Sequence, residues 1–122
     1  MVYNNLKNNS LIERIDKNDG SILWKIEKIY DKKRFNNFNM EISVYLNSIN
    51  NTINEYLVKF DYLVSKLKEK NIRLLNEEEC KDIGIKDSSN LFSSKYLEKY
   101  NMNNNEKDIS FMYRYFIFKR IS

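Results

Sequence analysis

The sequence has no histidine and a single cysteine, Cys80. One thiol cannot form a disulfide within the chain, so a disulfide-stabilised fold is excluded. Without histidine, the chain cannot build a zinc site of the Cys/His type or a Ser-His or Cys-His nucleophile. We therefore expect no metal site, and the side-chain sets of the commonest zinc enzymes and hydrolases are excluded.

Proline is absent and glycine occurs twice, whereas Asn, Lys and Ile are abundant. This bias is typical of an AT-rich genome, so we give the asparagine clusters little functional weight. No apolar run approaches the roughly 20 residues that a membrane span needs. The N-terminus also has no basic segment followed by an apolar stretch, as a signal peptide would. We expect an intracellular, cytoplasmic protein without a membrane partner.

The charge is positive overall but is not concentrated in one place. The 122 residues carry a formal net charge of +4. That value is compatible with a nucleic-acid partner, but Lys and Glu are interspersed and no basic stripe stands out. The charge alone is therefore weak support for RNA binding. The chain length and the absence of a long linker predict a single domain over residues 1–122.

Four segments have the composition of strands. Residues 22–30 and 41–46 alternate apolar and polar side chains, as half-buried strands do. A basic, aromatic-containing connection joins them, and residues 72–75 fit a shorter strand. Residues 109–121 are apolar on both faces, which predicts a strand in the middle of a sheet and not on its edge.

Apolar residues at helical spacing predict the clearest helix, over residues 55–70. Asn54 is a suitable N-cap for it. The remaining predicted elements are helices at 77–83 and 90–100, a broken or short helix within 2–15, and Asn-rich loops at 47–51 and 101–105.

Two motifs carry a resemblance to a known family. Glu55-Tyr56-Leu57-Val58 lies at the entry to the predicted helix, and an aromatic run at 113–118 closes the chain. In order and position, these segments resemble the back half of the mRNA cap guanine-N7 methyltransferases, over nearly the whole chain. The resemblance implies an α/β, partial Rossmann-like methyltransferase fold that lacks the N-terminal cofactor-binding half. It also implies a viral or similarly AT-rich source.

In such a fold we expect a mixed sheet of about four strands, with residues 109–121 central and antiparallel to a neighbouring strand, and with helices packed against the sheet.

The resemblance further implies that Glu55 and Tyr113 bind the cap guanine. A carboxylate can accept hydrogen bonds from the adjacent N1–H and N2–H groups of guanine, a pair of donors that adenine lacks. Tyr113 would be a second cap contact, through its ring or its hydroxyl. The simpler alternatives are that Glu55 interacts with a helix N-terminus and that Tyr113 is a core residue of a strand.

We expect no catalytic residue in this chain. Guanine N7 already carries the lone pair that attacks the methyl group, so no base has to remove a proton first. Alignment of the reactants can supply much of the rate. The family binds S-adenosylmethionine through a glycine-rich loop, whereas Gly20 and Gly84 are isolated. S-adenosylmethionine is thus expected as the cofactor of the complete enzyme, and no cofactor is expected for this chain alone.

The expected partners are the 5' end of capped mRNA and, in a split enzyme, a separate chain that carries the cofactor-binding half. Two alternatives stay open: a non-catalytic accessory subunit that docks on a capping enzyme, and a small protein-interaction domain. Several basic residues could meet RNA phosphates, although surface solvation explains each of them separately. They are Lys32, Lys33, Arg34, Lys119 and Arg120.

Overall fold

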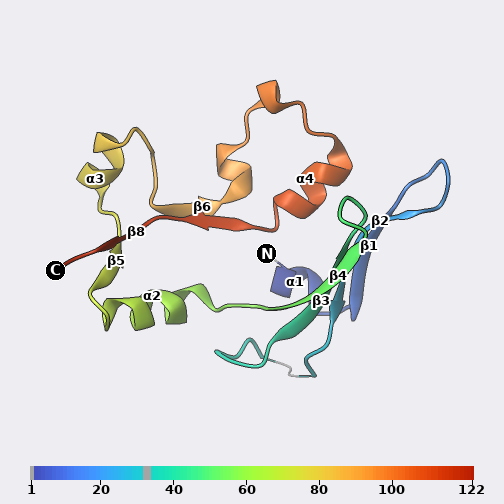
Figure 1. Cartoon of the computed structure of the whole chain (residues 1–122), viewed down its shortest axis with the longest axis horizontal. Coiled ribbons are helices and arrows are strands. Elements are labelled where there is room, and N and C mark those ends of the chain that lie inside the picture. Colours follow the sequence, from blue (N-terminus) through green and yellow to red (C-terminus); the bar gives the residue numbers. More distant parts are fainter. Residues whose placement is uncertain (1, 32–33) are drawn as a thin grey trace. The chain divides into compact units, whose positions relative to one another are not determined.

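The computed structural model describes residues 2–31 and 34–122. The chain forms two compact units, Met1–Lys59 (unit 1) and Phe60–Ser122 (unit 2). Figure 1 shows the elements of each unit along the chain. The predicted single domain over residues 1–122 stays a prediction. Within the described ranges, no helix combines the length and the apolarity that crossing a membrane requires.

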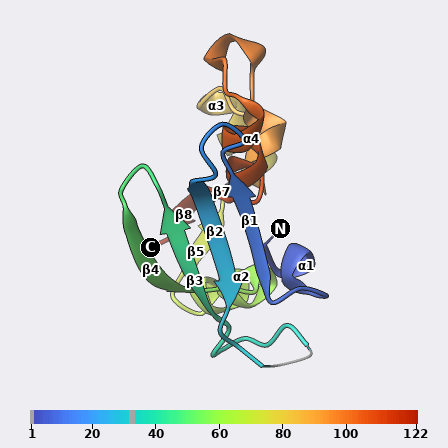
Figure 2. The same cartoon turned by 90° about the vertical axis from the view of Figure 1, so that its right-hand side faces the viewer.

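Unit 1 is an antiparallel sheet with one short helix. Its four strands are hydrogen-bonded in chain order, and Figure 2 shows them side by side. Gly20 in the first hairpin and Asn50 in the third connection have positive φ angles of 74° and 46°. Gly and Asn tolerate this conformation best, so these residues suit tight turns. The elements are α1 (Val2–Leu6), β1 (Leu11–Ile15), β2 (Ile22–Lys28), β3 (Glu41–Leu46) and β4 (Asn51–Tyr56).

The core of unit 1 lies on one face of the sheet. Ile26 in β2 is opposite Val44 in β3, and both side chains are buried. Directly opposed residues point to the same face, so the alternation in β2 and β3 places their apolar side chains together. The sequence prediction of these two strands is confirmed. The buried residues of unit 1 are Leu6, Trp24, Ile26, Tyr30, Met40, Ile42 and Val44.

Unit 2 contains short elements. Two antiparallel pairs of strands, β5 with β8 and β6 with β7, form two separate ladders. Helices α3 and α4 each begin with a capping box, formed by Asn76 with Glu79 and by Asn103 with Glu106. The elements are α2 (Phe60–Lys68), β5 (Ile72–Leu74), α3 (Glu77–Asp82), β6 (Ser89–Leu91), the 3-10 helices η1 (Phe92–Lys95) and η2 (Glu98–Tyr100), α4 (Asn104–Ser110), β7 (Arg114–Phe116) and β8 (Phe118–Arg120).

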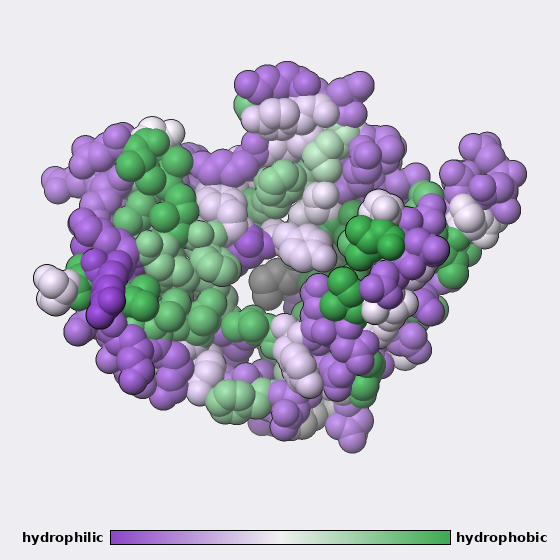
Figure 3. Space-filling model, in the orientation of Figure 1, coloured by the Kyte–Doolittle hydropathy of each residue, from purple (hydrophilic) through white to green (hydrophobic). Residues whose placement is uncertain are grey.

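Unit 2 has a thin core. Cys80, at 2% exposure, is its one buried residue among those described. Large apolar residues stay exposed, including Ile83 at 57% and Phe116 at 49%. Figure 3 shows that apolar side chains gather between α2 and α3 on the face in view. Exposed apolar surface of this kind is common where a partner binds.

Part of the predicted helix over residues 55–70 is wrong. The helix α2 begins at Phe60, and Asn51–Tyr56 is the strand β4, so Asn54 is not an N-cap. The strand forms because β4 pairs with β3 along six residues, from Glu41 opposite Tyr56 to Leu46 opposite Asn51. The hydrogen bonds of the β3–β4 hairpin override the helical spacing in this segment.

The predicted central strand over residues 109–121 is also wrong in its extent. Residues up to Ser110 belong to α4, and the remainder forms β7 and β8. The backbone of Ile117 accepts a hydrogen bond from Leu75 and donates one to Ser88, so the chain changes partner strand at this residue. Each short strand has one paired neighbour in the described structure and is not central.

Two smaller predictions are corrected in the same way. Residues 90–100 form the end of β6 and two 3-10 turns in place of an α-helix, and the broken helix within 2–15 is helical only to Leu6 and then becomes β1. The short strand at β5 and the helix at α3 are confirmed.

The expectation of helices with a four-stranded sheet is confirmed. The sheet is antiparallel throughout and not mixed, and it belongs to unit 1. An all-antiparallel sheet is not typical of a Rossmann-like fold, which is built on parallel strands.

Candidate functional site

Glu55 lies on the edge strand β4. It is directly opposite Ile42 in β3, and therefore on the same face of the sheet as the buried core of unit 1. Glu55 is nevertheless exposed, and no hydrogen bond or ion pair to its carboxylate occurs within the described part of the chain. The alternative role as a first-turn acid of a helix is wrong, because α2 begins five residues later, at Phe60.

Tyr113 lies in the turn between α4 and β7, and not within a strand. Its amide donates to the carbonyl of Ser110 at 3.1 Å, and its carbonyl accepts from the amide of Phe92 at 2.9 Å. With 45% exposure, Tyr113 is a surface residue and not a core residue. Glu55 belongs to unit 1 and Tyr113 to unit 2, so the prediction that they face one ligand stays a prediction.

An aromatic cluster in unit 2 was missed by sequence reasoning. The ring of Tyr96 meets Phe111 edge-on at 5.6 Å between centroids, and the ring centroid of Tyr100 lies 6.4 Å from that of Tyr96. Phe92 is 6.5 Å from Phe111. The repeated Lys-Tyr pairs at 95–96 and 99–100 were the available signal. Their spacing of four residues was interpreted as an ordinary helix, whereas the segment forms two 3-10 turns.

A charged network joins the β5–β8 ladder to α3. Arg73 donates two hydrogen bonds to the carboxylate of Glu79, at 2.7 and 3.0 Å, and Lys119 donates a third at 2.8 Å. The backbone amide of Asn76 donates a fourth, at 3.0 Å. These donors, Arg73 first, hold the pKa of Glu79 far below its ordinary value. The Glu79 acceptors are occupied, so this network is structural.

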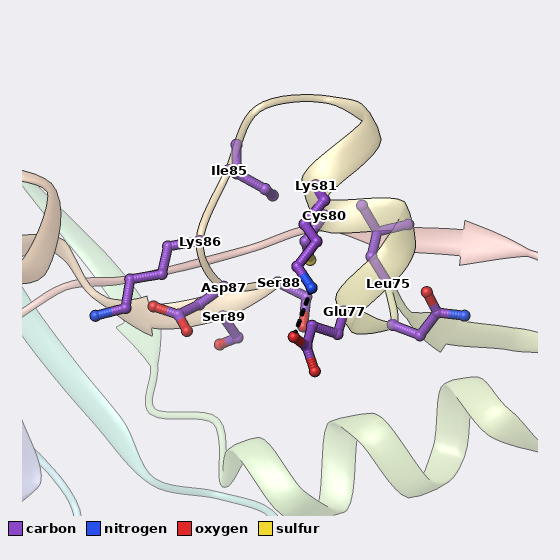
Figure 4. A pocket seen from close by; sticks show the side chains of 10 residues that line it. Leu75, Glu77, Cys80, Lys81, Ile85, Lys86, Asp87, Ser88 and Ser89 are labelled. Atoms are coloured by element: carbon purple, nitrogen blue, oxygen red, sulfur yellow. Dashed lines mark ion pairs between the residues drawn. The ribbon is translucent and has the colours of Figure 1, made fainter.

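A hollow of about 590 Å³ lies between α3 and the loop that leads into β6 (Figure 4). Lys81 pairs with Glu77 at 2.9 Å beside it. Two lysines and two carboxylates line the hollow, so it does not favour an ion of either sign. Its lining residues are Leu75, Asn76, Glu77, Cys80, Lys81, Ile85, Lys86, Asp87, Ser88 and Ser89.

The described residues do not fit S-adenosylmethionine in the manner that the resemblance implies. Gly20 lies in a hairpin turn of unit 1, and Gly84 follows α3 in unit 2. Neither glycine stands in a loop that connects a parallel strand to a helix, where such a cofactor binds. No group of three or more potential metal ligands is formed by the residues described.

The basic residues that could meet RNA phosphates have different positions. Lys32 and Lys33 lie outside the described residues, whereas Arg34 and Arg120 are exposed. Lys119 is engaged by Glu79. Arg34 belongs to unit 1, and Lys119 and Arg120 belong to unit 2, so the expectation that these residues meet RNA phosphates stays a prediction.

Comparison with known proteins finds no protein family and no curated protein that matches this chain.

Proposed function

We propose that this chain is the cap-binding, C-terminal portion of an S-adenosylmethionine-dependent mRNA cap guanine-N7 methyltransferase. Its role is to bind the guanine of capped mRNA, and a separate cofactor-binding half supplies the methyl donor. The chain alone is not active. For a chain of viral origin, the proposed place of this activity is the cytoplasm.

The observation that carries this proposal is the state of Glu55. Its carboxylate is exposed and has no partner among the described residues, and the helix-terminal role that would explain it is removed by the strand β4. Both oxygens are thus available to accept the two N–H groups of a guanine edge. Charge-assisted hydrogen bonds of this kind are stronger than neutral ones, and they favour guanine over adenine.

The order of elements after Glu55 also supports the proposal. Strand β4 leads to helix α2 and then to β5, and the last strand, β8, pairs antiparallel with β5. The resemblance implies a last strand that is antiparallel to its neighbour. A Rossmann-like sheet would be completed only by strands of the cofactor-binding half. The thin core and exposed apolar residues of unit 2 favour such a partner.

The proposed role of Glu55 and Tyr113 is to position the cap guanine for methyl transfer. S-adenosylmethionine, when bound by the other half, supplies the methyl group to the N7 lone pair. Glu55 would fix the guanine edge, and Tyr113 would pack its ring or direct its hydroxyl against the nucleotide. Correct alignment of two reactants is itself worth several kcal/mol of a reaction barrier, on the order of 7–11 in the best cases. No residue of this chain has to transfer a proton.

The test compares a guanosine-capped RNA with the same RNA bearing an adenosine cap. We expect the chain to prefer the guanosine cap. Glu55→Gln should weaken that binding roughly 5- to 150-fold, because the amide group of Gln then faces a guanine N–H donor with a donor of its own, and the guanine donor is left unpaired. Glu13→Gln, an exposed acid on the opposite edge strand β1, is the matched control and should bind as the natural chain does. Equal binding of both caps, or an unchanged preference in Glu55→Gln, would overturn the proposal.

A second measurement concerns the cofactor. By calorimetry at micromolar concentration, the chain alone should show no saturable binding of S-adenosylmethionine, and addition of the cofactor-binding half should restore binding. Saturable binding by the chain alone would contradict the assignment of this chain to the cap-binding half.

The accessory-subunit alternative is favoured by a different observation. All six residues of β4 are exposed, and β4 has one paired neighbour among the described strands, β3. An open edge of this kind can accept a strand from another protein. If this chain stimulates a complete capping methyltransferase equally well with and without Glu55→Gln, the accessory role is supported over cap binding.

A further inference from the structure

The aromatic cluster of unit 2 has an exposed outer layer. Tyr96 and Phe111 are half-buried and form its base. Tyr100 is 58% exposed, Tyr113 is 45% exposed and Phe92 is 36% exposed. The ring of Phe92 lies near that of Phe111, and the ring of Tyr100 lies near that of Tyr96. The amide of Phe92 donates a hydrogen bond to the carbonyl of Tyr113. Several aromatic rings are therefore held close together at the surface of one unit.

Lysines lie over the rings of this segment. The Lys99 ammonium is 5.4 Å from the centroid of Tyr100, and Lys107 is 4.7 Å from that of Tyr96. Lys95 lies 5.3 Å from the ring of Tyr115. Lys107 also meets Glu98, at 3.8 Å. Within the described residues, Lys95 and Lys99 have no carboxylate partner, so both charges are available to a ligand.

We propose that this surface, Phe92, Lys95, Lys99, Tyr100 and Tyr113, binds single-stranded RNA. Bases would stack on the exposed rings, while the two unpaired lysines would meet phosphates. The binding of single-stranded RNA stands on this geometry alone. Its identification as the stretch that follows the cap rests on the proposed function.

The composition favours nucleic acid over a protein partner. Protein interfaces are enriched in aromatic residues but depleted in lysine, and their centres exclude charge. Here each lysine lies within 6 Å of a ring centroid. Such interleaving of cations and stacking surfaces is what single-strand binders use, because every base has a face that can stack and every linkage carries a negative charge.

The test is fluorescence anisotropy with a labelled, uncapped 12-nucleotide RNA that has no self-pairing. Tyr100→Ala should weaken binding roughly 5- to 150-fold, through the loss of one stacked base. Lys99→Gln should weaken it less and lower the slope of log K against log salt by about 0.7, the loss of one phosphate contact on a single strand. Phe38→Ala removes an aromatic residue that is 63% exposed in unit 1, and it is the control expected to bind normally.

Circular dichroism of each variant separates loss of binding from loss of folding. Lys99→Gln is a second variant that should fold normally, because its side chain is outside the aromatic base.

The proposal is overturned if the chain does not bind the RNA at low salt, if Tyr100→Ala and Lys99→Gln bind as Phe38→Ala does, or if double-stranded RNA binds equally well. Absence of RNA binding, together with self-association that Tyr100→Ala abolishes, would identify a protein-binding surface instead. The probe carries no cap, so a failure of the proposed cap recognition by Glu55 does not affect this result.

Discussion

The carboxylate of Glu79 connects three segments of unit 2. It accepts hydrogen bonds from Arg73 in β5, from Lys119 in β8 and from the amide of Asn76 before α3. The side chain of Glu79 is 19% exposed, so the network is more enclosed than an ordinary surface ion pair. A single residue thus fixes the helix α3 against the β5–β8 ladder.

Because these donors depress the pKa of Glu79 below its ordinary value of 4.5, its contribution to stability depends on pH. The contribution is present above pH 4.5 and is lost as the pH falls towards the folded-state pKa. We expect Glu79→Gln to lower the urea midpoint at pH 7, and the difference from the natural chain to shrink at pH 3. Equal differences at the two pH values would contradict this account.

Glu77→Gln is the matched control for that measurement. Glu77 pairs with Lys81 on the same helix, but both side chains are more than two-thirds exposed, at 82% and 71%. Exposed pairs of this kind contribute little, so the midpoint should change little at either pH.

At the scale of elements, the helix α4 is the clearest departure from the sequence pattern, and its cap offers a test. The side chain of Asn103 accepts from the amide of Glu106 at 2.9 Å, and Glu106 returns a bond to the Asn103 amide at 2.8 Å. Asn103→Ala should therefore cost about 0.5–2 kcal/mol in the free energy of unfolding. Asn104→Ala, one residue inside the helix, should cost less, since Ala is a good helix former. Equal costs, measured by urea unfolding, would favour an extended segment.

The strands of unit 1 differ in how much each contributes. Ile26 in β2 is 0% exposed, whereas Ile53 in the edge strand β4 is 44% exposed. Ile26→Ala should destabilise unit 1 by about 2–5 kcal/mol, because it leaves a cavity in the core. Ile53→Ala should cost less than half of that, since much of its side chain already contacts solvent. Urea unfolding followed by Trp24 fluorescence measures both, and similar costs would contradict the observed edge position of β4.

For the whole molecule, the two units provide their own reporters. The one tryptophan of the sequence, Trp24, is buried in unit 1, and the one cysteine, Cys80, is buried in unit 2. We expect Cys80 to become reactive at a lower urea concentration than that at which Trp24 fluorescence changes, because unit 2 has the thinner core. Coincident transitions would indicate one cooperative domain instead.

Elements whose signals are local could be predicted from the sequence. Alternation around Ile26 and around Val44 identified β2 and β3, because the period of two is a property of the strand itself. The helix α3 was also predictable, since its acidic first turn and the following Gly84 are adjacent in the chain. The exposed acid at Glu55 was singled out through a resemblance, although its place in a strand was not predicted.

Where the strands end, and which strands they pair with, depends on contacts between segments of the fold. Glu55 and Tyr56 belong to the predicted helix over residues 55–70, yet pairing with β3 makes them part of the strand β4. The final apolar run could not reveal that Ile117 passes from one partner strand to another. The hydrogen bonds of a ladder join two different segments, and in the β5–β8 pair these are more than 40 residues apart, as Leu74 and Phe118 show. The apolar spacing within one segment does not report the stability that such pairing adds. The clustering of Tyr96, Tyr100 and Phe111 also depends on contacts between segments. Where the sequence predicted a helix over 90–100 and a strand from 109, the structure has two 3-10 turns followed by α4.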